Sequence, residues 1–130
     1  MHDPAEYCRA IERYSPDPLS VEHIVPRSKG GDGSPRNLAG SCQGCNNHKY
    51  RSTEAPDPQT GEMVLLFHPR RQRWRDHFAW SLDLTRVVGI TPTGRATVEL
   101  LRLNRMGLVN MRRVLWKEGI HPPHEVEEED

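Results

Sequence analysis

Residues 21–50 read VEHIVPRSKGGDGSPRNLAGSCQGCNNHKY. Residues 21–25 alternate like a short β-strand, and residues 26–35, with two prolines and three glycines, require a long loop. Ser41 can cap a helix, and residues 42–50 contain neither proline nor a β-branched residue, so they suit a short helix. The stretch therefore predicts a strand, a loop and a helix, in that order.

Four polar side chains of this stretch have the chemistry needed to cut a phosphodiester. The imidazole of His23 has an ordinary pKa of about 6.5 and can take a proton from water near neutral pH. A carboxylate and an amide oxygen are hard ligands for Mg²⁺ or Mn²⁺, and Glu22 and Asn46 supply them. Lys49 offers a positive charge for the phosphate. The strand and the helix can bring all four around one small volume.

Each of these residues, taken alone, also has an ordinary structural explanation. Glu22 fits a solvated strand position, His23 a hydrogen-bonded structural histidine, and Asn46 a helix surface. Asn37 fits a turn, and Lys49 fits solvated helix surface as well as it fits a phosphate contact. Their joint spacing is what favours a functional site.

Five short motifs keep fixed spacings within these thirty residues: EHIVP at 22–26, SKGG at 28–31, NL at 37–38, CxxCN at 42–46 and HK at 48–49. Together they resemble the signature of the HNH endonucleases, whose active site is a ββα-metal unit of treble-clef-like form. The resemblance implies a metal-dependent endonuclease that hydrolyses DNA with a single divalent metal ion.

The resemblance also implies a role for each matching residue. His23 would be the general base that activates water, and Asn37 would orient the loop and the base. Glu22 and Asn46 would hold Mg²⁺ or Mn²⁺. Lys49 matches a position where the family frequently has Lys or His.

The cysteines depart from the family pattern. Many HNH proteins bind a structural zinc ion with two cysteine pairs, the first often reading Cys-Glu-Tyr-Cys, but here the first of those positions is Ala5. Closed zinc sites need four ligands, and the chain offers Cys8, Cys42 and Cys45, with His2 as a further candidate. Zinc binding, a site that has lost zinc, and three buried thiols of a reducing compartment all stay open. The odd number of cysteines argues against a disulfide framework.

The formal net charge of zero hides an uneven distribution. Five of the 18 acidic residues fall in 125–130, which we expect to be a disordered tail, so the other 124 residues carry a formal charge of +5. Near His68 and His77 four arginines crowd together, and such clusters either neutralise nucleic-acid phosphates or form solvated surface. We assign them to nucleic-acid binding: Arg70, Arg71, Arg73 and Arg75.

The second half predicts further strands and helices. Residues 63–67 and 86–91 suit strands, and the aromatic residues of 74–80 suit packing rather than stacking on bases. Thr93 can cap one helix, and a second helix should follow Asn104 and continue until Gly119. The apolar stripes of these helices, which are most simply core, comprise Val98, Leu100, Leu101, Leu103, Leu108, Met111 and Leu115.

This half also resembles an extension found on small bacterial HNH proteins, through LFHPR at 66–70 and TPTGRAT at 91–97. We therefore expect an α+β protein. Its ββα-metal nuclease unit should occupy residues 1–55, and a β-hairpin-plus-helices extension at 56–124 should pack against it. The acidic tail would follow.

The remaining bulk properties narrow the function classes. Residues 1–130 contain no apolar run near the roughly 20 residues of a membrane span, so we expect a cytoplasmic protein. Two other functions fit parts of the sequence. One is a catalytically inactive nucleic-acid-binding module, and the other is a regulatory protein that binds a partner through its apolar helices.

Overall fold

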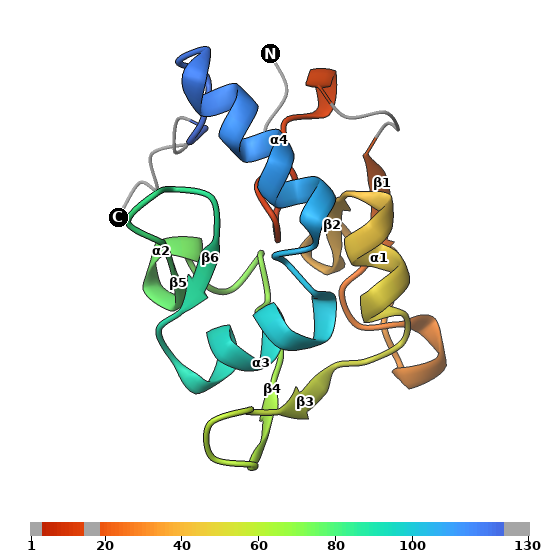
Figure 1. The fold of residues 1–130 in the computed structure, drawn as a ribbon. Coiled ribbons are helices and arrows are strands. Elements are labelled where there is room, and N and C mark those ends of the chain that lie inside the picture. Colours follow the sequence, from red (N-terminus) through yellow and green to blue (C-terminus); the bar gives the residue numbers. More distant parts are fainter. Residues whose placement is uncertain (1–3, 15–18, 124–130) are drawn as a thin grey trace.

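The computed structural model describes residues 4–14 and 19–123, which form three small antiparallel hairpins and four α-helices (Figure 1). The expected mixture of helices and strands is confirmed. Short 3₁₀ helices lie at Glu12–Tyr14, Arg27–Lys29 and Pro35–Asn37. The hairpins pair β1 (Ser20–His23) with β2 (Leu38–Ser41), β3 (Glu54–Pro56) with β4 (Met63–Leu65), and β5 (Phe78–Trp80) with β6 (Val87–Gly89).

The stretch expected to carry the site folds as a hairpin followed by a helix. β1 pairs with β2 so that His23 lies opposite Leu38, and α1 (Gln43–Lys49) follows directly. The expected cap Ser41 was wrong. The helix is capped by Cys42, whose Sγ accepts the amide of Cys45 at 3.4 Å, because Ser41 is still the last residue of β2.

The second half forms helices α2 (Trp74–His77), α3 (Pro92–Leu101) and α4 (Met106–Lys117). The expected cap Thr93 was wrong, because Thr91 Oγ1 accepts the amide of Gly94 at 3.0 Å and Pro92 takes the first helical position. The expected C-terminal helix is confirmed as α4, and Gly119 follows it with φ +75°.

The two expected strands are present but shorter. The strand expected at 63–67 ends at Leu65, because Phe67 turns into the core and donates its amide to Thr97 Oγ1 at 2.9 Å. The strand expected at 86–91 is reduced to β6, and its partner β5 was not anticipated. The aromatic residues pack, as expected: Trp74 is 5% exposed and Phe78 is 1% exposed, with ring centroids 5.1 Å apart.

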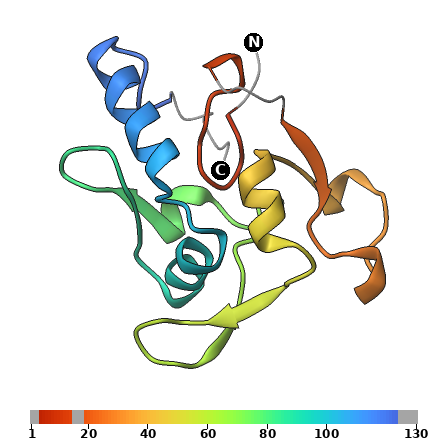
Figure 2. The same ribbon diagram turned by 45° about the vertical axis from the view of Figure 1, so that its right-hand side comes forward.

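The core joins the two halves of the chain. Helix α3 packs against α1 and against the β3, β4 and β6 strands. In both views α1 and α3 lie between α4, towards the top, and the β3–β4 hairpin, at the bottom (Figures 1 and 2). Of the expected apolar stripes, Leu101, Leu103, Leu108 and Leu115 are buried, and the others pack against the core partly buried, although α3 ends before Leu103.

One buried arginine of the second half also binds the first half. Arg112 on α4 is 2% exposed, and its guanidinium donates to the carbonyls of Cys8 at 3.2 Å, Leu103 at 2.8 Å and Thr85 at 2.9 Å.

None of the helices in the described residues is long and apolar enough to cross a membrane. His2 and the acidic tail at 125–130 lie outside the described residues.

Candidate functional site

A cavity of about 400 Å³ lies where β1 meets α1. Its walls include Glu22 and His23 from the strand and Asn46 from the helix, so three of the expected site residues line one space. Tyr50 and Arg51, just after α1, line it as well. The remaining wall comes from Val21 and from the loop that follows β1, through Pro26, Arg27 and Ser28.

His23 is the last residue of β1 and is half-buried. Its Nε2 atom is buried and has no hydrogen-bond partner among the described residues. A buried polar nitrogen left without a partner costs about 1–3 kcal/mol, so such an atom is a place where a missing water or ligand is expected. The buried Nε2 of His23 is thus available to bind a water molecule or a ligand.

Glu22 is held from behind the cavity. Successive strand residues face opposite sides, and Glu22 is 4% exposed while its neighbour Val21 is 71% exposed. The hydroxyl of Tyr7 donates to Glu22 Oε2 at 2.5 Å, and the Lys49 ammonium lies 3.7 Å from the same oxygen. Burial raises the pKa of the Glu22 carboxyl, while the Lys49 charge and the Tyr7 hydrogen bond oppose that rise.

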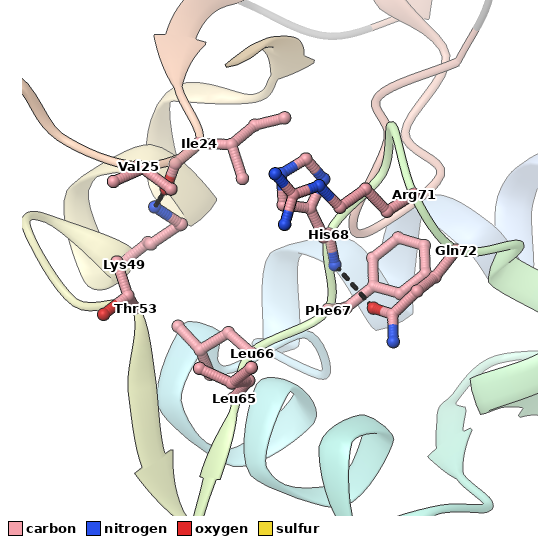
Figure 3. Close-up of a pocket in the computed structure, with 10 residues that line it drawn as sticks. All are labelled: Ile24, Val25, Lys49, Thr53, Leu65, Leu66, Phe67, His68, Arg71 and Gln72. Carbon is pink, nitrogen blue, oxygen red and sulfur yellow. Dashed lines mark hydrogen bonds between the residues drawn. The ribbon is translucent and has the colours of Figure 1, made fainter. Parts of the chain in front are cut away.

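Lys49 lies behind the cavity instead of lining it. Its side chain is 1% exposed, and its Nζ donates to the carbonyl of Ile24 at 2.8 Å (Figure 3). It borders a second cavity of about 200 Å³ with apolar walls that include Leu66 and Phe67. Burial lowers the pKa of Lys49, and the Glu22 charge opposes this. A phosphate contact by Lys49 stays a prediction, one that its burial disfavours.

Asn37 ties the loop between β1 and β2 to the end of β1. It is 8% exposed, and its Oδ1 accepts the amide of Val25 at 2.8 Å. Its Nδ2 donates to the carbonyl of Val25 at 3.0 Å and to that of Asp32 at 2.7 Å. The loop closes tightly here, because a Cβ on Gly31 would lie 1.7 Å from the Val25 carbonyl oxygen. Asn37 therefore fixes the loop that follows His23.

The arginine cluster is only partly free to meet an anion. Arg70 donates its Nε to the Leu38 carbonyl at 2.9 Å and forms an ion pair with Glu6. Arg73 forms an ion pair with Asp76 at 3.4 Å. Arg71 and Arg75 are exposed. Arg70 and Arg71 also border a groove of about 390 Å³ whose wall continues through Arg36, Ser34, Asp32, Gly31, Gly30, Val25 and Asn37. Nucleic-acid binding by these arginines stays a prediction.

The three cysteines meet in the core. Their Sγ atoms all lie within 4.8 Å of one another, and Cys8 Sγ lies 3.5 Å from Cys42 Sγ. Hydrogen bonds from the Cys45 and Cys8 thiols lower the pKa of Cys42, and the same contacts raise those of Cys8 and Cys45. The cluster could bind a metal ion. Among residues 4–14 and 19–123 the group contains three potential ligands, one fewer than a closed zinc site requires.

Several site residues were missed from the sequence. Tyr7 lies 15 residues before its hydrogen-bond partner Glu22. Arg105 donates a hydrogen bond to the sulfur of Cys42, 63 residues earlier in the chain. No local sequence pattern indicates contacts over such separations. Tyr50 and Arg51 directly follow the CxxCN and HK motifs, and their position after the helix is the signal that could have found them. Arg27 has a similar signal, since it follows the strand and Pro26.

Comparison with known proteins gives one family match. Residues 6–52 match a family model described as HNH endonuclease, so the resemblance is confirmed over about a third of the chain. The matched segment contains Tyr7, the β1–β2 hairpin and α1. Searches of curated proteins and of solved structures found no match.

Proposed function

We propose that the chain is a metal-dependent endonuclease that hydrolyses phosphodiester bonds of DNA, a proposal supported by the match of residues 6–52 to the HNH endonuclease family. The observation that carries this proposal is that His23 Nε2, beside a cavity that Asn46 also lines, has no hydrogen-bond partner within residues 4–14 and 19–123. In this proposal the β1–β2 hairpin and α1 act as the ββα-metal unit.

The cavity offers a suitable donor set for a catalytic ion. Glu22 and Asn46 supply a carboxylate and an amide group beside His23, and Mg²⁺ and Mn²⁺ favour oxygen ligands of this kind. We propose that these two residues hold the ion. When bound there, Mg²⁺ or Mn²⁺ would stabilise negative charge on the scissile phosphate and on the leaving 3′ oxygen.

His23 activates the attacking water, and Asn37 positions the loop that follows His23. His23 accepts a proton from water as the water oxygen bonds to phosphorus and the bond from phosphorus to the 3′ oxygen breaks. The leaving oxygen is protonated from solvent. Proton transfer of this kind typically contributes about 10²–10⁴-fold to the rate. Asn37 acts as a positioning residue, because its three hydrogen bonds fix the loop that begins two residues after His23.

Lys49 and Tyr7 support the site from the interior. Lys49 neutralises part of the Glu22 charge from 3.7 Å and holds the Ile24 carbonyl, so we propose that it positions β1. Tyr7 fixes one oxygen of Glu22 by its hydrogen bond. The mechanism does not require the cysteine cluster, since the cavity walls are made by other residues.

Positive side chains surround the path that DNA would take. Arg27 and Arg51 line the cavity itself, and both are exposed. Arg71 and Arg36 border the neighbouring groove beyond the loop that follows β1. Arginines bind phosphates without reading sequence, so this arrangement supports a phosphate track leading to His23. Arg70, Arg73 and Arg75 would flank that track.

Cleavage of supercoiled plasmid by the purified chain tests the proposal. Reactions contain Mg²⁺, Mn²⁺ or EDTA, and His23→Ala is compared with His48→Ala, which replaces an exposed histidine of α1. We expect nicked or linear DNA only with the metal ions, loss of cleavage in His23→Ala, and full cleavage in His48→Ala. Equal cleavage by His23→Ala would refute the role of His23.

The same material distinguishes the enzyme from a binding module. If the folded parent retains DNA in a gel-shift measurement but cleaves none with either metal, the catalytic proposal fails and nucleic-acid binding remains. If it neither cleaves nor retains DNA, both proposals fail.

A further inference from the structure

The family resemblance aligns Ala5 with the first cysteine of a zinc-binding pair, and alanine has no ligand atom. Ala5 is completely buried in the same core cluster as Cys8, Cys42 and Cys45. A methyl group cannot coordinate zinc, and closed zinc sites use four ligands. The three thiols alone therefore do not fit a closed structural zinc site.

A cation from the other half of the chain lies against these thiols. Arg105, between α3 and α4, places its Nη2 at 3.4 Å from Cys42 Sγ and 3.7 Å from Cys45 Sγ. Its Nη1 lies 3.8 Å from Cys45 Sγ. These are distances at which a guanidinium donates hydrogen bonds to sulfur, so the cluster already has a positively charged partner.

The guanidinium is fixed independently of the cysteines. Its Nη1 also donates to the carbonyl of Leu101 at 2.8 Å and to that of Arg102 at 3.0 Å. It lies against the first turn of α1, since a Cβ on Gly44 would approach Nη2 to 2.7 Å and Cζ to 2.9 Å. Gly44 thus leaves the space that lets Arg105 reach the thiols.

We propose that Arg105 closes the cysteine cluster in place of a zinc ion. Like the metal, the guanidinium supplies positive charge to a group of thiols, and it contacts Cys42 and Cys45 at the start of α1, while Cys8 contacts Cys42. Unlike the metal, it ties the start of α1 to the connection between α3 and α4. The domain is then stabilised without zinc, by a contact that needs the C-terminal extension. This inference does not depend on the proposed nuclease activity.

Zinc content and thermal stability of the full chain test the first part of the proposal. The protein is produced in zinc-supplemented medium, dialysed without chelator, and measured for zinc; its melting temperature is then compared with and without EDTA. We expect zinc far below one ion per chain and the same melting temperature in both conditions. One zinc ion per chain, with a lower melting temperature in EDTA, would overturn the proposal.

Variants of Arg105 test the second part. Arg105→Ala should lower the melting temperature by roughly 5–10 °C, because buried thiols lose a charge-assisted hydrogen-bond partner. Arg105→Lys should restore part of the loss, since it keeps the charge without the two-pronged geometry. Arg113→Ala, which removes an exposed arginine of α4, is the matched control and should change little. A melting temperature for Arg105→Ala equal to that of the control would refute the role of Arg105, and failure of Arg105→Ala to fold in zinc-free buffer would support it.

Discussion

The hydroxyl of Tyr7 donates a 2.5 Å hydrogen bond to Oε2 of Glu22, and both side chains are buried. The two residues come from different segments, the turn at the start of the described chain and the middle of β1. A carboxylate fixed in this way keeps one oxygen occupied. The hydrogen bond therefore sets the direction in which Glu22 can face the cavity.

Tyr7→Phe should weaken both the fold and metal binding. Loss of a hydrogen bond to a charged group should lower the free energy of unfolding by about 1.5–3 kcal/mol in urea titrations. Loss of an outer partner of a metal ligand should weaken Mn²⁺ binding about 10–100-fold in calorimetric titrations. Tyr14→Phe, on an exposed ring, should change neither quantity. Unchanged Mn²⁺ affinity in Tyr7→Phe would argue against Glu22 as a ligand.

Lys49→Met should destabilise the protein without changing how its DNA affinity depends on salt. Removal of one partner of a buried ion pair costs about 3–5 kcal/mol. Arg71→Ala should instead leave stability unchanged and reduce the slope of log affinity against log salt by about 0.9, the value for one phosphate contact. Binding of duplex DNA in EDTA measures the slopes. A reduced slope in folded Lys49→Met would place its ammonium at the phosphate after all.

Tyr50 combines an unusual backbone with an exposed ring. It has φ 50° and ψ −116°, the residue is 69% exposed and lines the cavity, and Arg51 Cζ lies 5.0 Å from the ring centroid. Because glycine tolerates positive φ, Tyr50→Gly should be more stable than Tyr50→Ala by about 1 kcal/mol.

The ring of Tyr50 should also contribute to DNA binding. Both truncations should weaken binding of single-stranded DNA by about tenfold, the lower part of the range for one stacked base. Tyr50→Phe keeps the ring and should bind like the parent in a fluorescence anisotropy titration. Parental affinity in both truncations would show that the ring does not contact DNA.

Acid should weaken the contact between Asp57 and Arg95. Two hydrogen bonds from Arg95, at 2.9 and 2.8 Å, hold the pKa of Asp57 below its ordinary value. The unfolded chain then binds this proton more readily, so the stabilisation is complete above the unfolded pKa of about 3.9 and is lost as the pH falls below it.

Asp57→Asn isolates this contribution. The difference in unfolding free energy between the parent and Asp57→Asn should stay constant from about pH 8 to pH 5 and shrink below about pH 4. Urea titrations across this range measure it. A difference that stays constant down to about pH 2 would contradict a lowered pKa for Asp57.

Much of the site segment could be predicted from the sequence because its information is local. The alternation of residues 21–25, the loop composition and the proline-free residues 42–50 each depend on neighbours in the chain, and β1 and α1 follow them. The capping residue of α1 did not follow from the sequence, since both Ser41 and Cys42 offer a side chain that accepts a hydrogen bond. The β-bridge to Ser41 decided between them.

Side-chain direction was the part that the sequence did not determine. Lys49 and Asn46 are three residues apart on one helix, yet the long lysine side chain turns inward to the Ile24 carbonyl while Asn46 lines the cavity. That difference depends on β1 lying beside α1. The contact between Arg105 and the cysteines could not be predicted from the sequence either, because Arg105 is separated by 60 residues from Cys45.

The buried guanidinium of Arg112 has a consequence for how this protein can be divided. It binds the Cys8 carbonyl, inside the segment that matches the HNH family, from a helix more than fifty residues beyond that match. A fragment ending near residue 55 would expose this carbonyl and lose the wall that α3 gives to α1. The segment that matches the HNH family therefore depends on the C-terminal helices for its packing, and transferring it to another protein would require those helices to be included.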